Sequence, residues 1–231
     1  METYTLKVIA RIHTDLPEKF GVPRQSGLVP ELRGRVVLEP EYSNADALRG
    51  IEGFDYLWLI WEFSLNGKSE GEWSPLVRPP LLGGNECVGV FATRSPFRPN
   101  ALGLSSVRLL GVEDDGNVLA LVVAGADLVD GTPIYDIKPY VEYADAHTGI
   151  RSGFVDEKRW EKVEVSFPDE LRALFSDEDF AVLVKVLELD PRPQYHNDPV
   201  RVYGMPFAGF DVRFRVSATG VLDVVGVEAV K

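Results

Sequence analysis

The sequence predicts a mainly β protein in which an antiparallel barrel, or a strongly curled sheet, precedes a small α+β unit. Apolar stretches of strand length recur through the first 140 residues and are joined by short links of Gly, Pro, Asp and Asn. Few helical patterns separate these stretches, which disfavours the right-handed crossovers of a parallel sheet. We therefore expect a barrel domain at residues 1–150 and a small α+β domain at residues 160–231.

The first half of the chain consists mainly of predicted strands. Residues 4–12 alternate between apolar and mostly polar side chains, which predicts a half-buried opening strand. A short helix is expected from Ser43, which suits an N-cap, to Gly50, which can adopt the left-handed stop conformation. Residues 54–63 are nearly all apolar, as in a strand covered on both faces. Further strands are predicted at residues 88–93, 104–110, 118–123 and 134–140.

The second half begins with a weakly patterned stretch, residues 144–164, which we interpret as a linker or an edge excursion. Residues 168–189 are predicted to be helical, with Ser176 able to cap a second segment. Residues 210–216 alternate, Thr219-Gly220 offers a turn, and residues 221–227 return as a second strand. The sequence therefore predicts a hairpin packed under a helix.

The composition indicates a cytoplasmic protein with no membrane span and no bound metal. No apolar run approaches the ~18 to 20 residues that a membrane span requires. The single cysteine, Cys87, cannot form an internal disulfide and is expected to be a small buried residue on or near a strand. Three scattered histidines offer no closely spaced ligand set for zinc.

The charge is unevenly distributed along the chain. The net charge of −12 argues against a general binder of polyanions. Residues 1–110 hold 12 basic and 13 acidic side chains, whereas residues 111–231 hold 12 basic and 23 acidic ones. An anionic partner is therefore expected on the first half, although scattered surface arginines are an alternative interpretation.

Two loops carry polar side chains on a stiffened backbone. Residues 91–100 read FATRSPFRPN, so two prolines restrict the backbone around Arg94, Arg98 and Asn100, as in a ligand cradle. The alternative is a stiff connection whose arginines pair with local carboxylates. Residues 23–27, PRQSG, form a proline-initiated turn that is either a second polar loop or a simple surface turn.

A third segment runs from Asp127 through a turn into the strand predicted at residues 134–140. In such a strand Asp136, Lys138 and Tyr140 share one face, so a carboxylate, an ammonium and a phenol point the same way. An ion pair on a solvated face is an equally good interpretation. A fourth segment, residues 190–195, combines Arg192 with a tyrosine, which suits either base stacking or packing between domains.

Several common motifs are missing from the sequence. It contains no G-x-G-x-x-G after a strand and no Walker-type loop, so neither a Rossmann dinucleotide site nor an NTPase is supported. It also lacks a G-x-S-x-G elbow, which weakens a hydrolase interpretation.

The chain resembles the TrmO family, also called TsaA-like or YaeB-like, in six ordered segments: PRQSG, VRPPLLGGN, GVFATRSPFRPN, GLS, DLVDGTPIYDIKPY and DPRPQY. The resemblance implies a single-sheeted β-barrel methyltransferase that works as a homodimer. It implies transfer of a methyl group from S-adenosylmethionine (SAM) to N6 of threonylcarbamoyladenosine at position 37, in the anticodon loop of tRNA. Two residues depart from the family pattern: Ala101 replaces a second proline, and Ser64 replaces a histidine after Phe63.

The resemblance also implies roles for individual residues. The cofactor contacts are expected to be Pro23, Arg24, Gln25, Arg94, Leu104, Asp127, Leu128, Val129 and Asp130. Our hypothesis for catalysis is that Asp136 accepts the N6 proton, while Lys138 holds the substrate or steadies the developing anion. Substrate contacts are predicted for Arg98, Asn100, Tyr140 and Arg192.

Two other functions are compatible with these residues. The first is a non-catalytic barrel that binds SAM or another nucleoside and reports it to a partner. The second is a hydrolase or lyase acting on a nucleoside phosphate, with Asp130 or Asp136 as the base.

Overall fold

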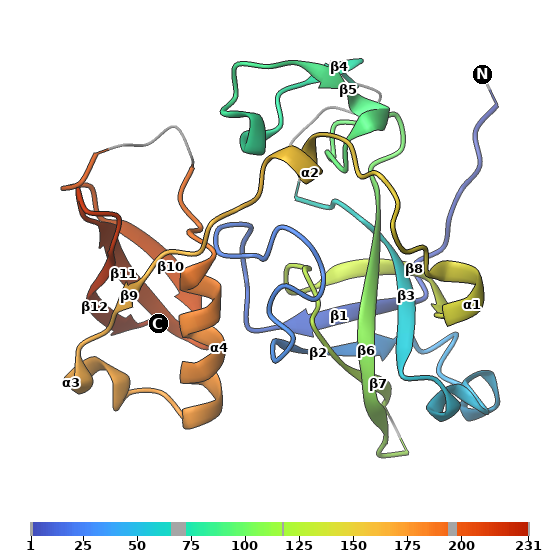
Figure 1. The fold of residues 1–231 in the computed structure, drawn as a ribbon. Helices are drawn as coiled ribbons and strands as arrows, with labels where there is room; N and C mark the ends of the chain where they lie inside the picture. Colours follow the sequence, from blue (N-terminus) through green and yellow to red (C-terminus); the bar gives the residue numbers. More distant parts are fainter. Residues whose placement is uncertain (1, 66–72, 117, 194–197, 231) are drawn as a thin grey trace. The chain divides into compact units, whose positions relative to one another are not determined.

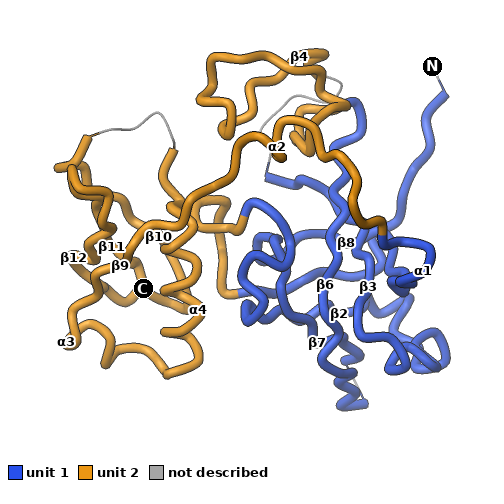
Figure 2. Tube along the Cα trace, in the orientation of Figure 1, with its two compact units in different colours: residues 1–14, 24–72, 99–146 blue, residues 15–23, 73–98, 147–231 orange. Residues whose placement is uncertain are grey.

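The computed structural model describes residues 2–65, 73–116, 118–193 and 198–230. The chain divides into two compact units, each built from several stretches of sequence (Figure 2). Unit 1 comprises residues 1–14, 24–72 and 99–146, and unit 2 comprises residues 15–23, 73–98 and 147–231.

Unit 1 contains a closed barrel of six strands, in which every neighbouring pair is antiparallel (Figure 1). This confirms the predicted mainly β class and the single barrel. In their order around the barrel the strands are β1 (Ala10–Thr14), β2 (Arg33–Leu38), β7 (Leu119–Ala124), β6 (Leu102–Asp114), β3 (Tyr56–Glu62) and β8 (Thr132–Pro139).

The barrel interior is filled by alternate side chains of these strands. On β3 the inward residues Leu57, Leu59 and Trp61 are buried, while the residues between them are only half-buried. This alternation follows from the period of two along a strand. The prediction that residues 54–63 are covered on both faces is therefore wrong for the outer face. The buried cluster contains Ala10, Ile12, Val36, Leu38, Leu57, Leu59, Trp61, Val107, Leu119, Leu121, Val123, Ala126, Leu128 and Ile134.

A bulge between β3 and β8 decides which residues of β8 face outwards. Trp61 pairs with Ile134, but Ile60, the next residue back along β3, pairs with Asp136. The extra residue on β8, Tyr135, reverses the alternation, because a bulge sets two residues opposite one. Ile134 therefore lies in the core, whereas Asp136 lies on the outer face beside Ile60.

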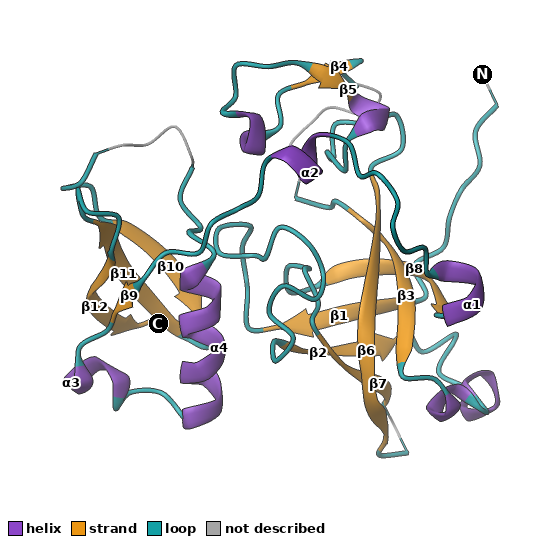
Figure 3. Cartoon of the chain, in the orientation of Figure 1, coloured by secondary structure: helices purple, strands orange, loops and turns teal. Residues whose placement is uncertain are grey.

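Unit 2 contains a four-stranded sheet and the longest helix of the described chain. The sheet order is β10 (Tyr203–Phe207), β11 (Phe210–Val216), β12 (Leu222–Ala229) and β9 (Val165–Ser166). Helix α4 (Asp177–Glu188) begins at Ser176, whose hydroxyl accepts the Asp179 N–H, and it follows the short helix α3 (Asp169–Arg172). The predicted hairpin is thus β11 and β12, and the predicted helical region is two helices (Figure 3).

The remaining elements are short. Unit 2 also holds a two-stranded hairpin of β4 (Leu76–Val77) and β5 (Val88–Gly89), with α2 (Phe154–Glu157) further along the chain. Unit 1 holds α1 (Glu142–Asp145). The 3-10 helices are η1 (Ala45–Leu48), η2 (Ile51–Gly53), η3 (Pro80–Leu82) and η4 (Val90–Ala92).

Four further local predictions were wrong. The helix cap predicted at Ser43 lies at Asn44, whose side chain accepts the Asp46 N–H at 2.9 Å. The opening strand starts only at Ala10, opposite the last residue of β2, and Tyr4 before it is 79% exposed, because an alternating pattern forms a strand only where a partner strand continues. After β5 the chain turns into η4 and not into a longer strand, and the Thr93 hydroxyl closes this turn by donating to the Val90 carbonyl at 2.8 Å. Cys87 lies next to β5 as expected, but it is exposed.

No helix of the described residues is both long enough and apolar enough to cross a membrane.

Candidate functional site

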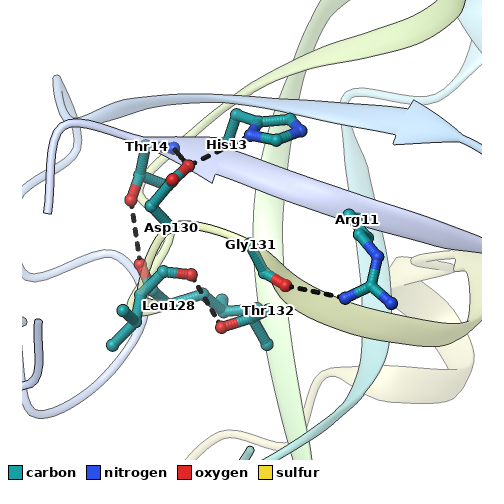
Figure 4. A network of polar contacts seen from close by, with 8 residues as sticks. Arg11, His13, Thr14, Leu128, Asp130, Gly131 and Thr132 are labelled. Atoms are coloured by element: carbon teal, nitrogen blue, oxygen red, sulfur yellow. Dashed lines mark hydrogen bonds and ion pairs between the residues drawn. The ribbon is translucent and has the colours of Figure 1, made fainter. Parts of the chain in front are cut away.

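The loop from Asp127 to Gly131 is attached to β1 by a set of polar contacts in unit 1 (Figure 4). The Asp130 carboxylate accepts the Thr14 N–H at 3.1 Å and lies 3.1 Å from Nδ1 of His13. The Thr14 hydroxyl donates to the Leu128 carbonyl at 3.2 Å, and Arg11 donates to the Gly131 carbonyl at 3.2 Å. These contacts tie the loop to the end of β1.

The residues of this loop do not all present side chains to a ligand. The Leu128 side chain is 1% exposed and packs in the barrel core, so only its backbone is available. No hydrogen bond from the backbone N–H groups of Leu128, Val129 and Asp130 is found within the described part of the chain. Of these three residues Leu128 is buried, Val129 is half-buried and Asp130 is exposed, so their N–H groups can donate to a ligand or to water.

A buried hydrogen-bond chain holds the start of the loop against β6. The indole N–H of Trp61 donates to the Ser105 hydroxyl at 2.9 Å, and that hydroxyl donates to Asp127 at 2.5 Å. Ser105 is 1% exposed. A Cβ at Gly103 would lie 2.2 Å from the Trp61 ring, so the glycine of the GLS segment leaves room for the indole. The segment therefore positions Asp127 through the barrel interior.

The loop that carries Arg24 and Gln25 docks on the same region. The Gly27 N–H donates to the Gly125 carbonyl at 2.8 Å, and both glycines have positive φ, at 79° and 77°. A Cβ at Gly125 would lie 3.4 Å from the Gly27 Cα, so the two backbones pass close to each other. Two of the segments predicted to bind the cofactor thus lie side by side at the end of β7.

Leu104 connects this region to the predicted catalytic residues. It neighbours Ser105 on β6, lies on the outer face of the barrel and is 56% exposed. Leu104 pairs with Ile60 of β3, and Ile60 pairs with Asp136 of β8. Two strand spacings separate Leu104 from Asp136, which is about 10 Å between their Cα atoms.

Asp136 and Lys138 form an ion pair on the outer face of β8. Their nearest side-chain atoms are 2.9 Å apart, with the Asp136 side chain 42% and the Lys138 side chain 62% exposed. The Ile137 N–H also donates to the Asp136 carboxylate at 2.9 Å. The Tyr140 ring lies next to Trp58, the residue paired with Lys138, at 5.5 Å between ring centroids. The three side chains thus share one face.

Tyr135 occupies the bulge and donates its hydroxyl to Glu62. Partial burial, followed by the nearby Glu62 carboxylate, raises the pKa of Tyr135 to about 12. The phenol therefore stays neutral near neutral pH, where it acts as a donor that fixes Glu62 at the end of β3.

The stiff loop at residues 91–100 lies mostly in unit 2. Arg98 donates from one Nη to the carbonyls of Thr93 and Ser95, both at 3.1 Å, so its guanidinium holds the loop together. Arg94 is exposed. Asn100, at the start of the next stretch of unit 1, is exposed, and its carbonyl accepts the Leu102 N–H.

Two further predicted contacts, Arg192 and Pro23, lie in unit 2. Arg192 pairs with Asp190 at 3.0 Å, and their side chains are only 18% and 9% exposed. Asp190 lies two residues after the end of α4 and has a positive φ of 48°. Pro23 is buried. Gln194 and Tyr195 of the same segment lie outside the described residues.

Three residues of the site were missed by sequence reasoning: His13, Thr14 and Ser105. Their position opposite Asp127 and Asp130 depends on the closure of the barrel, which a local sequence pattern cannot predict. The GLS segment was the one signal available, since it placed a serine among strand residues.

Within the described ranges, no group of three or more His, Cys, Asp and Glu side chains could hold a metal ion. A hollow of about 260 Å³ opens next to Arg11 and His13 on unit 1, but it is small for a ligand of the size of SAM.

Comparison with known proteins gives matches along nearly the whole chain. The family model described as tRNA-methyltransferase O N-terminal domain matches residues 11–146, and the TrmO C-terminal domain model matches residues 160–230. A protein of Escherichia coli named "tRNA (adenine(37)-N6)-methyltransferase" is 39% identical, with 95% of this chain and 96% of that protein covered.

Two further comparisons bear on the cofactor and the fold. A Pseudomonas aeruginosa protein named "Putative S-adenosylmethionine-dependent methyltransferase RcsF" is 38% identical over 97% of this chain and 99% of its own length. A solved structure titled "Crystal structure of TrmO" superimposes with a TM-score of 0.79 and 31% identity, covering 99% of this chain and all of the other.

Proposed function

The chain belongs to the tRNA-methyltransferase O family, and from this premise we propose that its acceptor is N6 of a threonylcarbamoylated adenosine at position 37 of tRNA. Its general activity is SAM-dependent methylation of N6 of adenosine 37 in tRNA. The threonylcarbamoyl group, the residues of the site, a homodimeric assembly and a cytoplasmic location are the parts that we propose.

One observation carries the assignment of the site. Loop 127–130, the Arg24–Gln25 loop, Leu104 and Asp136 form a connected series on unit 1, linked by Gly27 with Gly125, by Ser105 with Asp127, and by strand register. Residues that are far apart in sequence thus lie close enough to support a site in which the proposed cofactor contacts are followed by the proposed catalytic group.

The residues present fit the proposed cofactor. The open backbone N–H groups of Leu128, Val129 and Asp130 suit the polar atoms of a nucleoside or an amino acid, and exposed Leu104 offers an apolar contact. Arg24 and Gln25 would add polar contacts, and the proposed cofactor contact of Arg94 concerns unit 2. When bound, SAM supplies a methyl group already activated by its sulfonium.

The protein must then align the acceptor nitrogen and remove its proton. N6 next to a carbamoyl group is a poor nucleophile while it is protonated, so a carboxylate that accepts this hydrogen assists the reaction. Each oxygen of Asp136 has one partner, Lys138 or the Ile137 N–H. A carboxylate oxygen has two lone pairs, so either oxygen can still accept the N6 hydrogen.

Lys138 places a positive charge beside this carboxylate. Its ammonium can stabilise the developing negative charge or bind the carboxylate of the threonyl group. Tyr140, Arg98, Asn100 and Arg192 remain proposed substrate contacts. Arg98 and Arg192 also keep the local partners described above.

The substitution Asp136→Asn tests the catalytic role, because the amide keeps the shape but loses the basic oxygen pair. We expect turnover to fall at least about 100-fold while the dissociation constant for SAM changes less than about twofold. Asp46→Asn is a matched control, since Asp46 is another exposed carboxylate of unit 1 with a basic partner, Arg49. Near-normal turnover of Asp136→Asn would remove Asp136 from the role.

The acceptor is tested with tRNA that either carries or lacks the threonylcarbamoyl group. A mass increase of one methyl on the modified nucleoside, absent from unmodified adenosine, is the expected result. Binding of SAM without methyl incorporation would support the non-catalytic module, and release of phosphate or nucleoside would support a hydrolase. Sedimentation of the purified protein tests the dimer.

A further inference from the structure

The outer face of the barrel continues past Asp136 into a row of aromatic and basic residues. Tyr56 of β3 pairs with Arg108 of β6, and on its other side its carbonyl accepts the Tyr140 N–H at 2.9 Å. Paired residues of an antiparallel ladder point to the same face, so Arg108, Tyr56 and Tyr140 lie in one row across three strands. Four residues along β3 separate this row from the Asp136 row, which is about 13 Å.

The aromatic rings of this face form an open cluster. Tyr140 lies 6.3 Å from Tyr56 and 5.5 Å from Trp58, measured between ring centroids. The Trp58 indole N–H donates to Asp145 at 3.1 Å, which fixes the position of its ring. Tyr56 remains 45% exposed. An exposed ring supported by fixed rings is a surface on which a flat ligand can stack with little loss of side-chain entropy.

Arg108 differs from other arginines on the outer face of the barrel. Arg11 pairs with Glu39, and Arg35 pairs with Glu113. Arg108 is exposed and, as far as the described residues go, has no carboxylate partner. Its charge is therefore available to an anion beside the rings.

The charges around the cluster favour one kind of occupant. Of the carboxylates nearby, Asp145 accepts both the Trp58 indole and the Val141 N–H, and Asp136 pairs with Lys138. Arg108 is the basic side chain of the Tyr56 row, and within the described residues it has no carboxylate partner. Rings next to an unpaired guanidinium are typical of sites for unpaired bases and their phosphates, whereas a purely apolar partner would leave the charge buried without a counterion.

We propose that Tyr56 and Arg108 bind the anticodon loop beside the methylated adenosine, with an unpaired base stacked on Tyr56 and a phosphate on Arg108. This inference rests on the proposed function, and it adds two residues to the substrate contacts given above. The row lies on the same outer face as Asp136, so neighbouring nucleotides of one loop can reach both places.

Steady-state methylation of an anticodon stem-loop that carries the modified adenosine tests the stacking. We expect Tyr56→Ala to raise KM for the RNA about tenfold, with the SAM dissociation constant and the melting temperature unchanged. Tyr56→Phe keeps the ring and should stay near the wild-type KM, while Tyr56→Leu keeps the apolar volume without a ring and should behave like the alanine variant. Tyr4→Ala removes another exposed tyrosine of unit 1 and serves as the control.

The salt dependence of RNA binding tests the phosphate contact. Arg108→Ala should lower affinity and reduce the slope of log K against log salt by about one. Arg49→Ala, which removes an exposed arginine elsewhere on unit 1, should leave the slope unchanged.

The outcomes separate this inference from the proposed function. If the wild-type protein does not methylate the RNA, the proposed function fails. If it does, and Tyr56→Ala and Arg108→Ala keep the wild-type KM and salt slope, only this inference is overturned. A change in the molecular mass of the assembly in either variant would identify the face as a contact between two copies of the chain and would equally overturn it.

Discussion

The substitution Ser105→Ala probes the buried link between the barrel core and the cofactor loop. The Ser105 hydroxyl accepts the Trp61 N–H and donates to the Asp127 carboxylate, at 2.9 and 2.5 Å. Alanine removes both bonds at a position that is 1% exposed, so water cannot easily replace the hydroxyl. The Trp61 N–H then stays buried without an acceptor, and Asp127 loses a donor.

The expected loss of stability follows from these two changes. An unsatisfied buried donor costs about 1–3 kcal/mol, and a hydrogen bond to a charged group contributes about 1.5–3 kcal/mol. Because Asp127 is only half-buried and water can partly replace the lost donor, we take the low end of both ranges and expect about 2.5 kcal/mol. For a chain of this length that is a decrease in Tm of about 5 to 10 °C.

Calorimetry and SAM titration of the same samples provide the assay. Ser106→Ala is the matched control, because Ser106 is the next residue of β6, faces outwards and has no recorded side-chain partner among the described residues. Ser105→Ala should also weaken SAM binding, since Asp127 opens the loop that carries the free N–H groups. A Tm for Ser105→Ala within 2 °C of the Ser106→Ala value would show that the hydrogen-bond chain does not hold the loop.

Three further substitutions give distinct expectations. Tyr135 has a raised pKa, so its contribution to stability is present below about pH 10 and is lost as pH rises through about 12. Tyr135→Phe should lose the hydrogen bond to Glu62 and destabilise the protein by about 1 kcal/mol at neutral pH. In urea unfolding, the variant should no longer show this loss of stability at alkaline pH. Gly21→Ala should destabilise the protein by about 2–4 kcal/mol, because φ is 96° and the new Cβ would lie 2.4 Å from the Met205 sulfur. Adding Met205→Ala should relieve the clash but not the backbone strain. If the losses of the two substitutions simply add in chemical denaturation, the clash is contradicted. Arg98→Ala should make the 91–100 loop more susceptible to limited proteolysis, because the guanidinium holds two loop carbonyls, and an unchanged cleavage rate would refute that role.

The barrel could be predicted because the pattern of apolar residues within each strand indicates which side chains are buried. The apolar run of β3 and the alternation of β11 each encode a period of two, and turn residues separate them from their neighbours. The same reasoning failed at Tyr4, where an alternating pattern has no partner strand, and at Val90, where the chain turns. Hydrogen bonding between strands, which the pattern does not contain, decided both cases.

The candidate site was predictable only in part. The shared face of Asp136 and Lys138 follows from their spacing along one strand, and the structure has them as an ion pair. The sequence did not predict which face of the barrel carries these two side chains, because the bulge at Tyr135 reverses the alternation after Ile134. The predicted contacts at Arg98 and Arg192 have local partners that the sequence did not reveal.

The amino-acid sequence by itself determined that this protein is a β-barrel with an α+β appendage. Hydrophobic periods of two residues in strands and 3.6 residues in helices, and the residues of turns, are properties of short stretches of sequence. Its ordered motifs also determined the family. Only the tertiary structure decided that Ser105 meets Asp127, that Gly27 passes Gly125, and that Tyr56 and Arg108 lie on the outer face that also carries Asp136. Those neighbours arise from closing six strands in one register, and no local stretch of sequence carries that information.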